Sequence, residues 1–303
     1  MRSILLVNLG TPAAPTPAAV RAYLAEFLSD PRVVPLPRWL WLPILHGVVL
    51  RTRPAQSAEK YAQIWMPEGS PLAVHTIRQA QLLAERTQFR VRYAMRYGAP
   101  SIPAALRELE NPIVVPLYPQ YAESTTGSVL DALPPGVSAV REFHDHPAYI
   151  AALAALVRRH WSQHKRGAML LMSFHGLPRR SAGSYEQQCR ATASLLAQQL
   201  KLQDGEWRVT FQSRFGYAKW LQPYTEQTLI ELARGGCGRV DIVCPGFVAD
   251  CLETLEELGI RARARFRGAG GRDLRLIECL NEAPEWIEAL AALATEASGR
   301  AGP

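Results

Sequence analysis

The stretch AMLLMSFHGLP, from Ala168 to Pro178, decides the fold class. Its first five residues are apolar and fit a buried strand. Gly176 and Pro178 follow and indicate that the strand ends there. An ionisable imidazole, that of His175, stands where the strand ends. Ligands of parallel α/β sheets bind beyond the carboxyl ends of the strands, so His175 is a candidate functional residue. An ordinary structural histidine is the alternative.

Similar apolar runs recur along the chain and alternate with helix-like segments. The strand candidates lie in residues 4–9, 89–95, 113–118, 169–174, 209–212 and 240–244. The helix candidates cover residues 17–28, 73–86, 147–165, 185–200, 225–234 and 284–297. This alternation predicts parallel sheets covered by helices.

The two halves of the chain resemble each other at their strand ends. The first strands end in NLG and FHG, the second in RYG and RFG, and the third in PQY and PGF. We therefore predict an α/β protein of two similar Rossmann-like domains, each a parallel β-sheet flanked by helices, with a cleft between them. The predicted domains cover residues 1–150 and 151–303, and the final helix packs back across the chain.

Composition excludes several classes of protein. With 303 residues, 48% hydrophobic and 20% charged, the chain is long enough for one or two globular cores. The longest apolar stretch, Trp39–Leu50, contains a proline and a histidine and is too short to cross a bilayer. Five scattered cysteines indicate a reducing compartment, so we expect a cytoplasmic protein. The net charge of +7 comes with no nucleic-acid-binding motif, and no nucleic acid partner is expected.

A second candidate feature is the acidic stretch PGFVADCLETLEELG, from Pro245 to Gly259. We expect a helix to begin near Asp250. At about 100° per residue, Asp250, Glu253 and Glu257 then share one stripe. Two explanations stay open: a capping box of Asp250 and Glu253, or carboxylates that face His175. An imidazole facing a carboxylate makes a proton acceptor, a metal site, or both.

Several long motifs, in order, resemble those of the ferrochelatase family, which inserts ferrous iron into a porphyrin during haem synthesis. The motifs are NLGTP (8–12), GSPL (69–72), RYG (96–98), PLYPQYAESTTGS (116–128), SFHGLP (173–178), FQSRFG with WLQPYT (211–225) and PGFVADCLETLEE (245–257). They extend over nearly the whole chain. The resemblance implies a chelatase-like fold and a lyase acting in haem and porphyrin biosynthesis.

The resemblance also implies site residues. It assigns His175 and Glu253 as the catalytic pair, and His175, Glu253, Asp250 and Glu257 as groups that meet the metal. Which of His175 and Glu253 takes protons and which holds iron stays open. The implied contacts with the porphyrin ring or its propionates are Leu9, Arg51, Tyr61, Arg96, Tyr97, Tyr121, Ser124, Trp220 and Phe247. For the ring contacts, ordinary core packing is the alternative.

The sequence departs from the family pattern in three places. The loop after HGLP is short (residues 179–189), and Arg261 stands where many relatives carry an acid. No cysteine lies in the C-terminal tail, so no iron–sulfur cluster and no cofactor beyond the substrate Fe²⁺ is expected. The expected partners are the substrates porphyrin and Fe²⁺. The protein is expected to be a monomer.

An apolar segment at about residues 36–52 resembles the lip of the porphyrin cleft in this family. Its tryptophans and flanking arginines also fit peripheral contact with an inner-membrane surface. Protoporphyrin is the preferred substrate and coproporphyrin the alternative. Different classes of protein, namely a two-domain binding protein, a nucleotide-dependent enzyme or a chelatase for another tetrapyrrole, are the rival interpretations.

Overall fold

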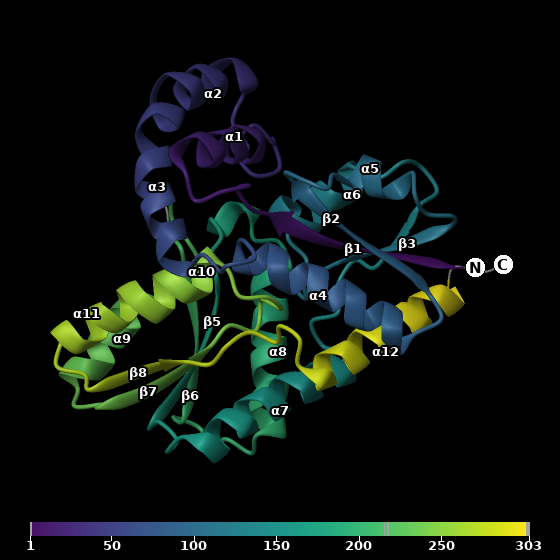
Figure 1. The fold of residues 1–303 in the computed structure, drawn as a ribbon. Coiled ribbons are helices and arrows are strands. Elements are labelled where there is room, and N and C mark those ends of the chain that lie inside the picture. Colours follow the sequence, from purple (N-terminus) through teal and green to yellow (C-terminus); the bar gives the residue numbers. More distant parts are fainter. Residues whose placement is uncertain (1, 215, 217, 301–303) are drawn as a thin grey trace. The chain divides into compact units, whose positions relative to one another are not determined.

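The computed structural model describes residues 2–214, 216 and 218–300, except for the side chain of residue 300. Residues 215 and 217, within the motif region 211–225, lie outside the described part. The chain divides into two compact units. Unit 1 comprises Met1–Glu142 and Ala291–Pro303, and unit 2 comprises Phe143–Leu290. Each unit has a four-stranded sheet (Figure 1).

Unit 1 has a parallel sheet in the order β2-β1-β3-β4. Its strands are β1 (Ser3–Gly10), β2 (Arg90–Tyr97), β3 (Pro112–Pro116) and β4 (Ser138–Ala139). β1 is flanked on both sides, and its residues Ile4 to Val7 are fully buried. A strand covered on both faces needs apolar side chains at successive positions, which explains the continuous apolar run.

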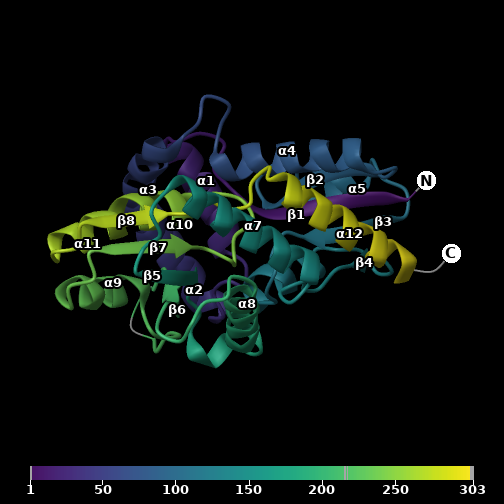
Figure 2. The same ribbon diagram turned by 90° about the horizontal axis from the view of Figure 1, so that it is seen from below.

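Helices cover this sheet and extend away from it. They are α1 (Pro17–Leu28), α2 (Arg38–Ile44), α3 (Leu50–Ile64), α4 (Pro71–Arg86), α5 (Ile102–Leu106) and α6 (Ser128–Asp131), with π-helical segments η1 (Leu45–Val49) and η2 (Glu123–Gly127). α4 contacts β1 and β2 and lies along the sheet in Figure 2. The last helix of the chain, α12 (Pro284–Arg300), begins in unit 2 and ends in unit 1.

Unit 2 repeats the topology of unit 1. Its parallel sheet has the order β6-β5-β7-β8, with β5 (Met169–His175), β6 (Trp207–Gln212), β7 (Arg239–Val243) and β8 (Asp273–Leu276). Its helices are α7 (Pro147–Gln163), α8 (Tyr185–Gln199), α9 (Thr225–Arg234), α10 (Leu252–Thr254) and α11 (Arg263–Gly268), with the 3₁₀ turn η3 (Arg179–Ser181) and the π-helix η4 (Leu255–Ala262). The prediction of two similar parallel α/β domains is confirmed.

The acidic helix differs from its prediction in where it starts and how it turns. It begins at Leu252, after an N-cap at Cys251 whose backbone N–H donates to Thr254 Oγ1 at 3.0 Å. The capping box therefore joins Cys251 and Thr254, so the alternative of a capping box of Asp250 and Glu253 is wrong, and the helix starts two residues after Asp250. From Leu255 the helix continues as η4, so the predicted spacing of about 100° per residue fails there.

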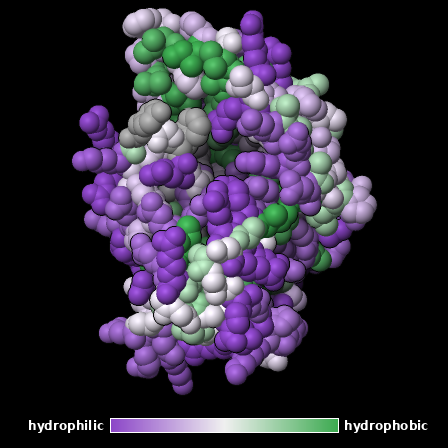
Figure 3. Space-filling view, turned by 90° about the vertical axis from the view of Figure 1, so that its left-hand side faces the viewer, coloured by the Kyte–Doolittle hydropathy of each residue, from purple (hydrophilic) through white to green (hydrophobic). Residues whose placement is uncertain are grey.

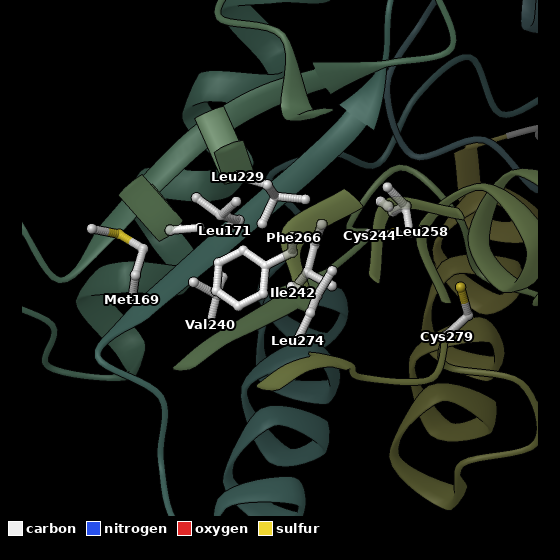
Figure 4. Packing of buried hydrophobic residues seen from close by; sticks show 12 residues of the cluster. Met169, Leu171, Leu229, Val240, Ile242, Cys244, Leu258, Phe266, Leu274 and Cys279 are labelled. Carbon is white, nitrogen blue, oxygen red and sulfur yellow. The ribbon is translucent and has the colours of Figure 1, made fainter. Parts of the chain in front are cut away.

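A hydrophobic core fixes this helix on the sheet of unit 2 (Figure 4). Leu258 of η4 and Phe266 of α11 are buried against β5 and β7 side chains such as Leu171 and Ile242. Gly271 allows the close packing, because a Cβ there would lie 2.2 Å from the Phe266 ring. The carboxylates of the helix are thus held at a fixed position relative to the strand that ends in His175.

Candidate active site

His175 is the last residue of β5, the strand that lies between β6 and β7. Its carbonyl oxygen accepts a hydrogen bond from the Tyr185 hydroxyl at 3.0 Å. The next residue, Gly176, donates its N–H to the Gln212 carbonyl at 2.8 Å. A Cβ on Gly176 would come within 2.7 Å of that carbonyl oxygen and 3.3 Å of the Trp220 ring. Only glycine fits there, which explains the His-Gly pair at the strand end.

The imidazole of His175 has one nitrogen engaged. Nδ1 lies 2.7 Å from the carbonyl oxygen of Gly176. Because a carbonyl oxygen only accepts, Nδ1 carries the hydrogen of this bond, and Nε2 of the neutral ring keeps its lone pair. The ring centroid lies 6.5 Å from that of Phe247, a predicted substrate contact. His175 therefore presents a base and ligand atom at the carboxyl edge of the sheet.

Glu257 of η4 is the carboxylate that interacts electrostatically with His175. Burial raises the pKa of Glu257 above its usual value, although hydrogen bonds from Ser213 and electrostatic interactions with Arg261 and His175 lower it in part. Ser213 donates its N–H to Oε1 at 2.8 Å and its hydroxyl to Oε2 at 2.6 Å. A raised pKa brings this carboxyl closer to neutral pH, where it can both accept and release a proton.

Glu253 of α10 is held through its backbone. Its carbonyl oxygen accepts a hydrogen bond from Gln212 Nε2 at 2.8 Å, and Gln212 Oε1 accepts one from the Ser173 hydroxyl at 2.7 Å. Burial raises the pKa of the Cys251 thiol well above its usual value, and the adjacent Glu253 carboxylate raises it further. Glu253 thus lies half-buried beside the Cys251 thiol, in the first turn of a helix tied to β5 and β6.

Asp250 is engaged within the protein. Its Oδ1 accepts from the Thr254 hydroxyl at 2.8 Å, and its Oδ2 accepts from Asn281 Nδ2 at 2.7 Å and from the Cys279 N–H at 3.2 Å. Its own N–H donates to Asn281 Oδ1 at 2.9 Å. These bonds use three of the roughly four acceptor positions of a carboxylate. Asp250 therefore fixes the loop before α10, and its contact with the metal stays a prediction.

Within residues 2–214, 216 and 218–300, no group of three or more His, Cys, Asp or Glu side chains is arranged to hold a metal ion. Glu257 interacts electrostatically with His175, Glu253 interacts with the Cys251 thiol, and Asp250 is hydrogen-bonded to Asn281. Unit 2 thus carries an imidazole at the carboxyl end of β5 and several carboxylates in and beside α10 and η4.

Comparison with known proteins shows the family of the chain. Residues 1–298 match the family model described as Ferrochelatase. The chain belongs to the ferrochelatase family. It is 57% identical to the ferrochelatase of Azoarcus sp. and 53% identical to that of Bordetella pertussis, in both cases over 95% of this chain and 85% of the relative. The chain is accordingly a lyase that inserts iron into a porphyrin in haem synthesis, and its substrates are iron and porphyrin.

Solved structures share the fold of this ferrochelatase-family chain. CbiX, described as the terminal enzyme of siroheme biosynthesis in denitrifying bacteria, matches with a TM-score of 0.53 at 18% identity, covering 98% of this chain and 99% of its own. SirB from Bacillus subtilis with Fe³⁺ matches with a TM-score of 0.57 at 12% identity, covering 98% and 95%. At these identities the match shows the chelatase-like fold.

Two predicted porphyrin contacts of the ferrochelatase-family chain, Arg96 and Tyr97, belong to a buried polar network in unit 1. Arg96 Nη2, the Tyr97 hydroxyl and the Ser128 hydroxyl all donate to Asp30 Oδ2, at 2.7, 2.8 and 2.6 Å. Burial would raise the pKa of Asp30, but these donors hold it below its usual value. Tyr97 is 1% exposed and forms part of the core. Arg96 already neutralises Asp30, so its contact with a propionate stays a prediction.

The other predicted contacts occupy varied environments. Leu9, the residue before the last of β1, is half-buried, and Tyr61 of α3 packs edge-on against Trp65, which follows that helix. The Tyr121 hydroxyl donates to Glu123 Oε1 at 3.1 Å, and Ser124 lies in η2. Arg51 is exposed on α3. Trp220 and Phe247 are half-buried in unit 2, and the buried Nε1–H of Trp220 has no hydrogen-bond partner among the described residues.

Four hydrogen-bond partners of the predicted site residues escaped the sequence analysis: Asp30, Gln212, Ser213 and Asn281. Gln212 ends β6 and Ser213 follows it within the quoted FQS motif, so their place at a strand end was the available signal. Asp30 and Asn281 carry no local pattern. Their roles depend on residues far away in sequence, such as Arg96 for Asp30.

The apolar segment forms the part of unit 1 that includes α2 and η1. Leu36, Trp39, Leu40, Ile44 and Val48 are 40–78% exposed. Figure 3 shows a hydrophobic patch at one end of the face in view. None of the described helices has the length and hydropathy needed to pass through a bilayer.

Proposed function

We propose that His175 and Glu253 form the catalytic pair for metalation of protoporphyrin, with Glu257 as the carboxyl that exchanges protons with them. The observation that carries the proposal is the hydrogen bond between Nδ1 of His175 and the Gly176 carbonyl, which leaves Nε2 as the nitrogen that offers a lone pair in the neutral ring. The proton-exchanging role of Glu257 is supported by its raised pKa and by its electrostatic interaction with His175.

The reaction sets the requirements for these groups. A porphyrin loses its two pyrrole N–H protons as a divalent iron binds the four ring nitrogens, so the site needs proton acceptors and ligands for Fe²⁺. Neutral imidazole and carboxylate suit ferrous iron. One of the two groups, His175 Nε2 or the Glu253 carboxylate, accepts a proton from the porphyrin ring, and the other binds the arriving iron. Glu257 returns the released protons to solvent. Asp250 holds the turn that carries these carboxylates.

The porphyrin itself requires apolar walls and groups for its carboxylates. We propose Leu9, Tyr61, Tyr121, Trp220 and Phe247 as ring contacts, and Arg51, Arg96 and Ser124 as candidates for the propionates. The free N–H of Trp220 supports its assignment, because a ligand or water must satisfy a buried donor. Protoporphyrin is favoured over coproporphyrin because exposed apolar side chains dominate residues 36–48.

The first test is anaerobic insertion of Fe²⁺ into protoporphyrin, followed through the porphyrin absorption bands. His175→Ala is expected to abolish metalation, since losing a general base typically costs 10²–10⁴-fold. His164→Ala, which removes an exposed histidine of the same unit, is the matched control and is expected to retain activity. Turnover by a folded His175→Ala protein would overturn the assignment. Faster conversion of coproporphyrin would overturn the substrate preference.

We also propose that the protein contains no iron–sulfur cluster. Burial raises the pKa of the thiols of Cys189, Cys244, Cys251 and Cys279, and Cys237 is half-buried with its thiol against the Arg239 carbonyl. Cluster ligation needs thiolates, which these environments disfavour. Acid-labile sulfide in protein purified under anaerobic conditions would contradict this proposal.

We further propose a cytoplasmic monomer, and the exposed apolar segment supports its contact with the surface of the inner membrane. Trp39 and Val48 are 78% and 57% exposed, and residues 31–58 contain four arginines and no acidic residue. Apolar side chains with cationic flanks suit an anionic bilayer surface. Trp39→Ser is expected to weaken binding to lipid vesicles, and unchanged binding would contradict the contact.

A further inference from the structure

A shallow pocket of about 390 Å³ lies between α1 and α3 of unit 1. Two arginines, Arg21 from α1 and Arg51 from α3, line it. The other lining residues are small or apolar: Pro17, Ala18, Leu50, Pro54 and Ala55. Its volume falls within the range of small-molecule sites. The pocket therefore combines an apolar surface with two cationic groups.

No described residue neutralises the two guanidinium groups. Neither Arg21 nor Arg51 makes an ion pair or a side-chain hydrogen bond with the residues that the structure describes. By contrast, Arg32 of the same unit pairs with Asp131 at 2.7 Å. The first turn of α1, which borders the pocket, carries no acidic residue. The positive end of the α1 dipole and both arginines thus favour an anion at one place.

The pocket adjoins the exposed apolar segment. Leu50 lines the pocket and packs in one cluster with Leu28 and Leu45. Leu45 begins η1, which also carries the exposed Val48 and leads directly into α3. A ligand in the pocket would lie beside side chains that favour an apolar phase.

We propose that the pocket between α1 and α3 binds the phosphodiester headgroup of an anionic phospholipid. This inference rests on the membrane contact proposed above and adds the ligand that orients it. The planar guanidinium of arginine donates two parallel hydrogen bonds to a pair of phosphate oxygens. The pocket has two arginines and no carboxylate to compete for them, so it can form two such pairs of bonds. The apolar lining matches the glycerol backbone and the first methylene groups of the acyl chains.

The test measures co-sedimentation of the full chain with vesicles of phosphatidylcholine alone or mixed with phosphatidylglycerol. Each basic residue near an anionic surface contributes roughly a fivefold factor in binding. Arg21→Gln is expected to reduce binding to the mixed vesicles about fivefold, and the Arg21→Gln/Arg51→Gln pair more than tenfold. The matched control is Arg107→Gln/Arg234→Gln, which removes the same charge from two exposed arginines and is expected to change binding less than twofold.

A second measurement separates a lipid site from a general anion site. Calorimetric titration with short-chain phosphatidylglycerol is expected to show saturable binding that is lost in the double variant, whereas inorganic phosphate binds much more weakly. Equal binding of inorganic phosphate would overturn the lipid assignment in favour of a free anion. Equal loss in the double variant and its control would overturn the site itself.

The outcomes also separate this inference from the proposed function. Iron insertion in detergent tests the function without a membrane, and Arg21→Gln is expected to leave its rate unchanged. If wild-type protein ignores anionic vesicles but metalates porphyrin, the headgroup site and the membrane contact fail while the function stands. If Arg51→Gln raises the KM for porphyrin and Arg21→Gln leaves vesicle binding intact, Arg51 serves the propionates and the headgroup site is overturned.

Discussion

At the scale of single residues, the hydrogen bonds from Ser213 lower the pKa of Glu257. Ser213 has a φ of +63°, in the left-handed region that few residues other than glycine adopt. That conformation lets both its N–H and its hydroxyl reach the same carboxylate, one oxygen each. Strain of this kind persists where surrounding contacts compensate for it, and it is concentrated at functional sites.

Ser213→Ala is expected to move the acidic limb of the pH–rate profile to higher pH by roughly one unit. The hydroxyl stabilises the ionised form of Glu257, so its loss raises a pKa that burial has already raised. Below that pKa the carboxyl is protonated and accepts no proton, so activity begins to fall at a higher pH. The profile of kcat against pH checks this. Ser181→Ala, which removes an exposed hydroxyl, serves as the control. Superimposable profiles would exclude Glu257 as the titrating acceptor.

At the scale of elements, the turn before α10 depends on a pair of side chains. Asp250 and Asn281 exchange two hydrogen bonds, side chain to side chain and backbone to side chain, at 2.7 and 2.9 Å. They join the start of the acidic helix to the segment that precedes α12. The position of the helix that carries Glu253 and Glu257 therefore depends on Asn281, which lies outside that helix.

Asn281→Gly is expected to lower the free energy of unfolding by about 1–3 kcal/mol, because it leaves Asp250 with unsatisfied buried polar groups. Asn281 has a φ of +42°, which glycine also adopts, so the change removes the amide without adding strain. Asn111→Gly is a matched control, since Asn111 has a φ of +46° and is exposed. Urea denaturation measures the free energy of unfolding of both variants. An equal loss in the two would contradict the role of Asn281.

Elements were predictable where a pattern extends over many residues. The central strands are continuous apolar runs, and α1 was predicted from its first residue to its last. The edge strands β4 and β8 escaped because two or four residues show no periodicity. The acidic helix was misplaced because Cys251 caps it and because a π-helix does not follow a period of 3.6. His175 was found from its strand end, whereas the bond from Ser213 to Glu257 links residues 44 apart.

At the scale of the whole molecule, each unit has its own sheet and core, so local destabilisation should remain largely local. Phe266→Ala removes a fully buried ring from unit 2 and is expected to cost about 3–5 kcal/mol. Amide hydrogen exchange should accelerate in β5 and β7 more than in β1. Val114→Ala, in the core of unit 1, is the reciprocal control. Equal acceleration in both units after either change would show one cooperative structure.

The exposure of Trp39 gives the chain a built-in optical reporter. Of its seven tryptophans, Trp39 is 78% exposed, Trp286 is fully buried, and the other five are half-buried. A soluble quencher such as acrylamide therefore reaches Trp39 first, and the early part of a quenching curve reports on this side chain. A shift of that emission toward the blue when vesicles are added would record the passage of Trp39 out of water, without any label attached to the protein.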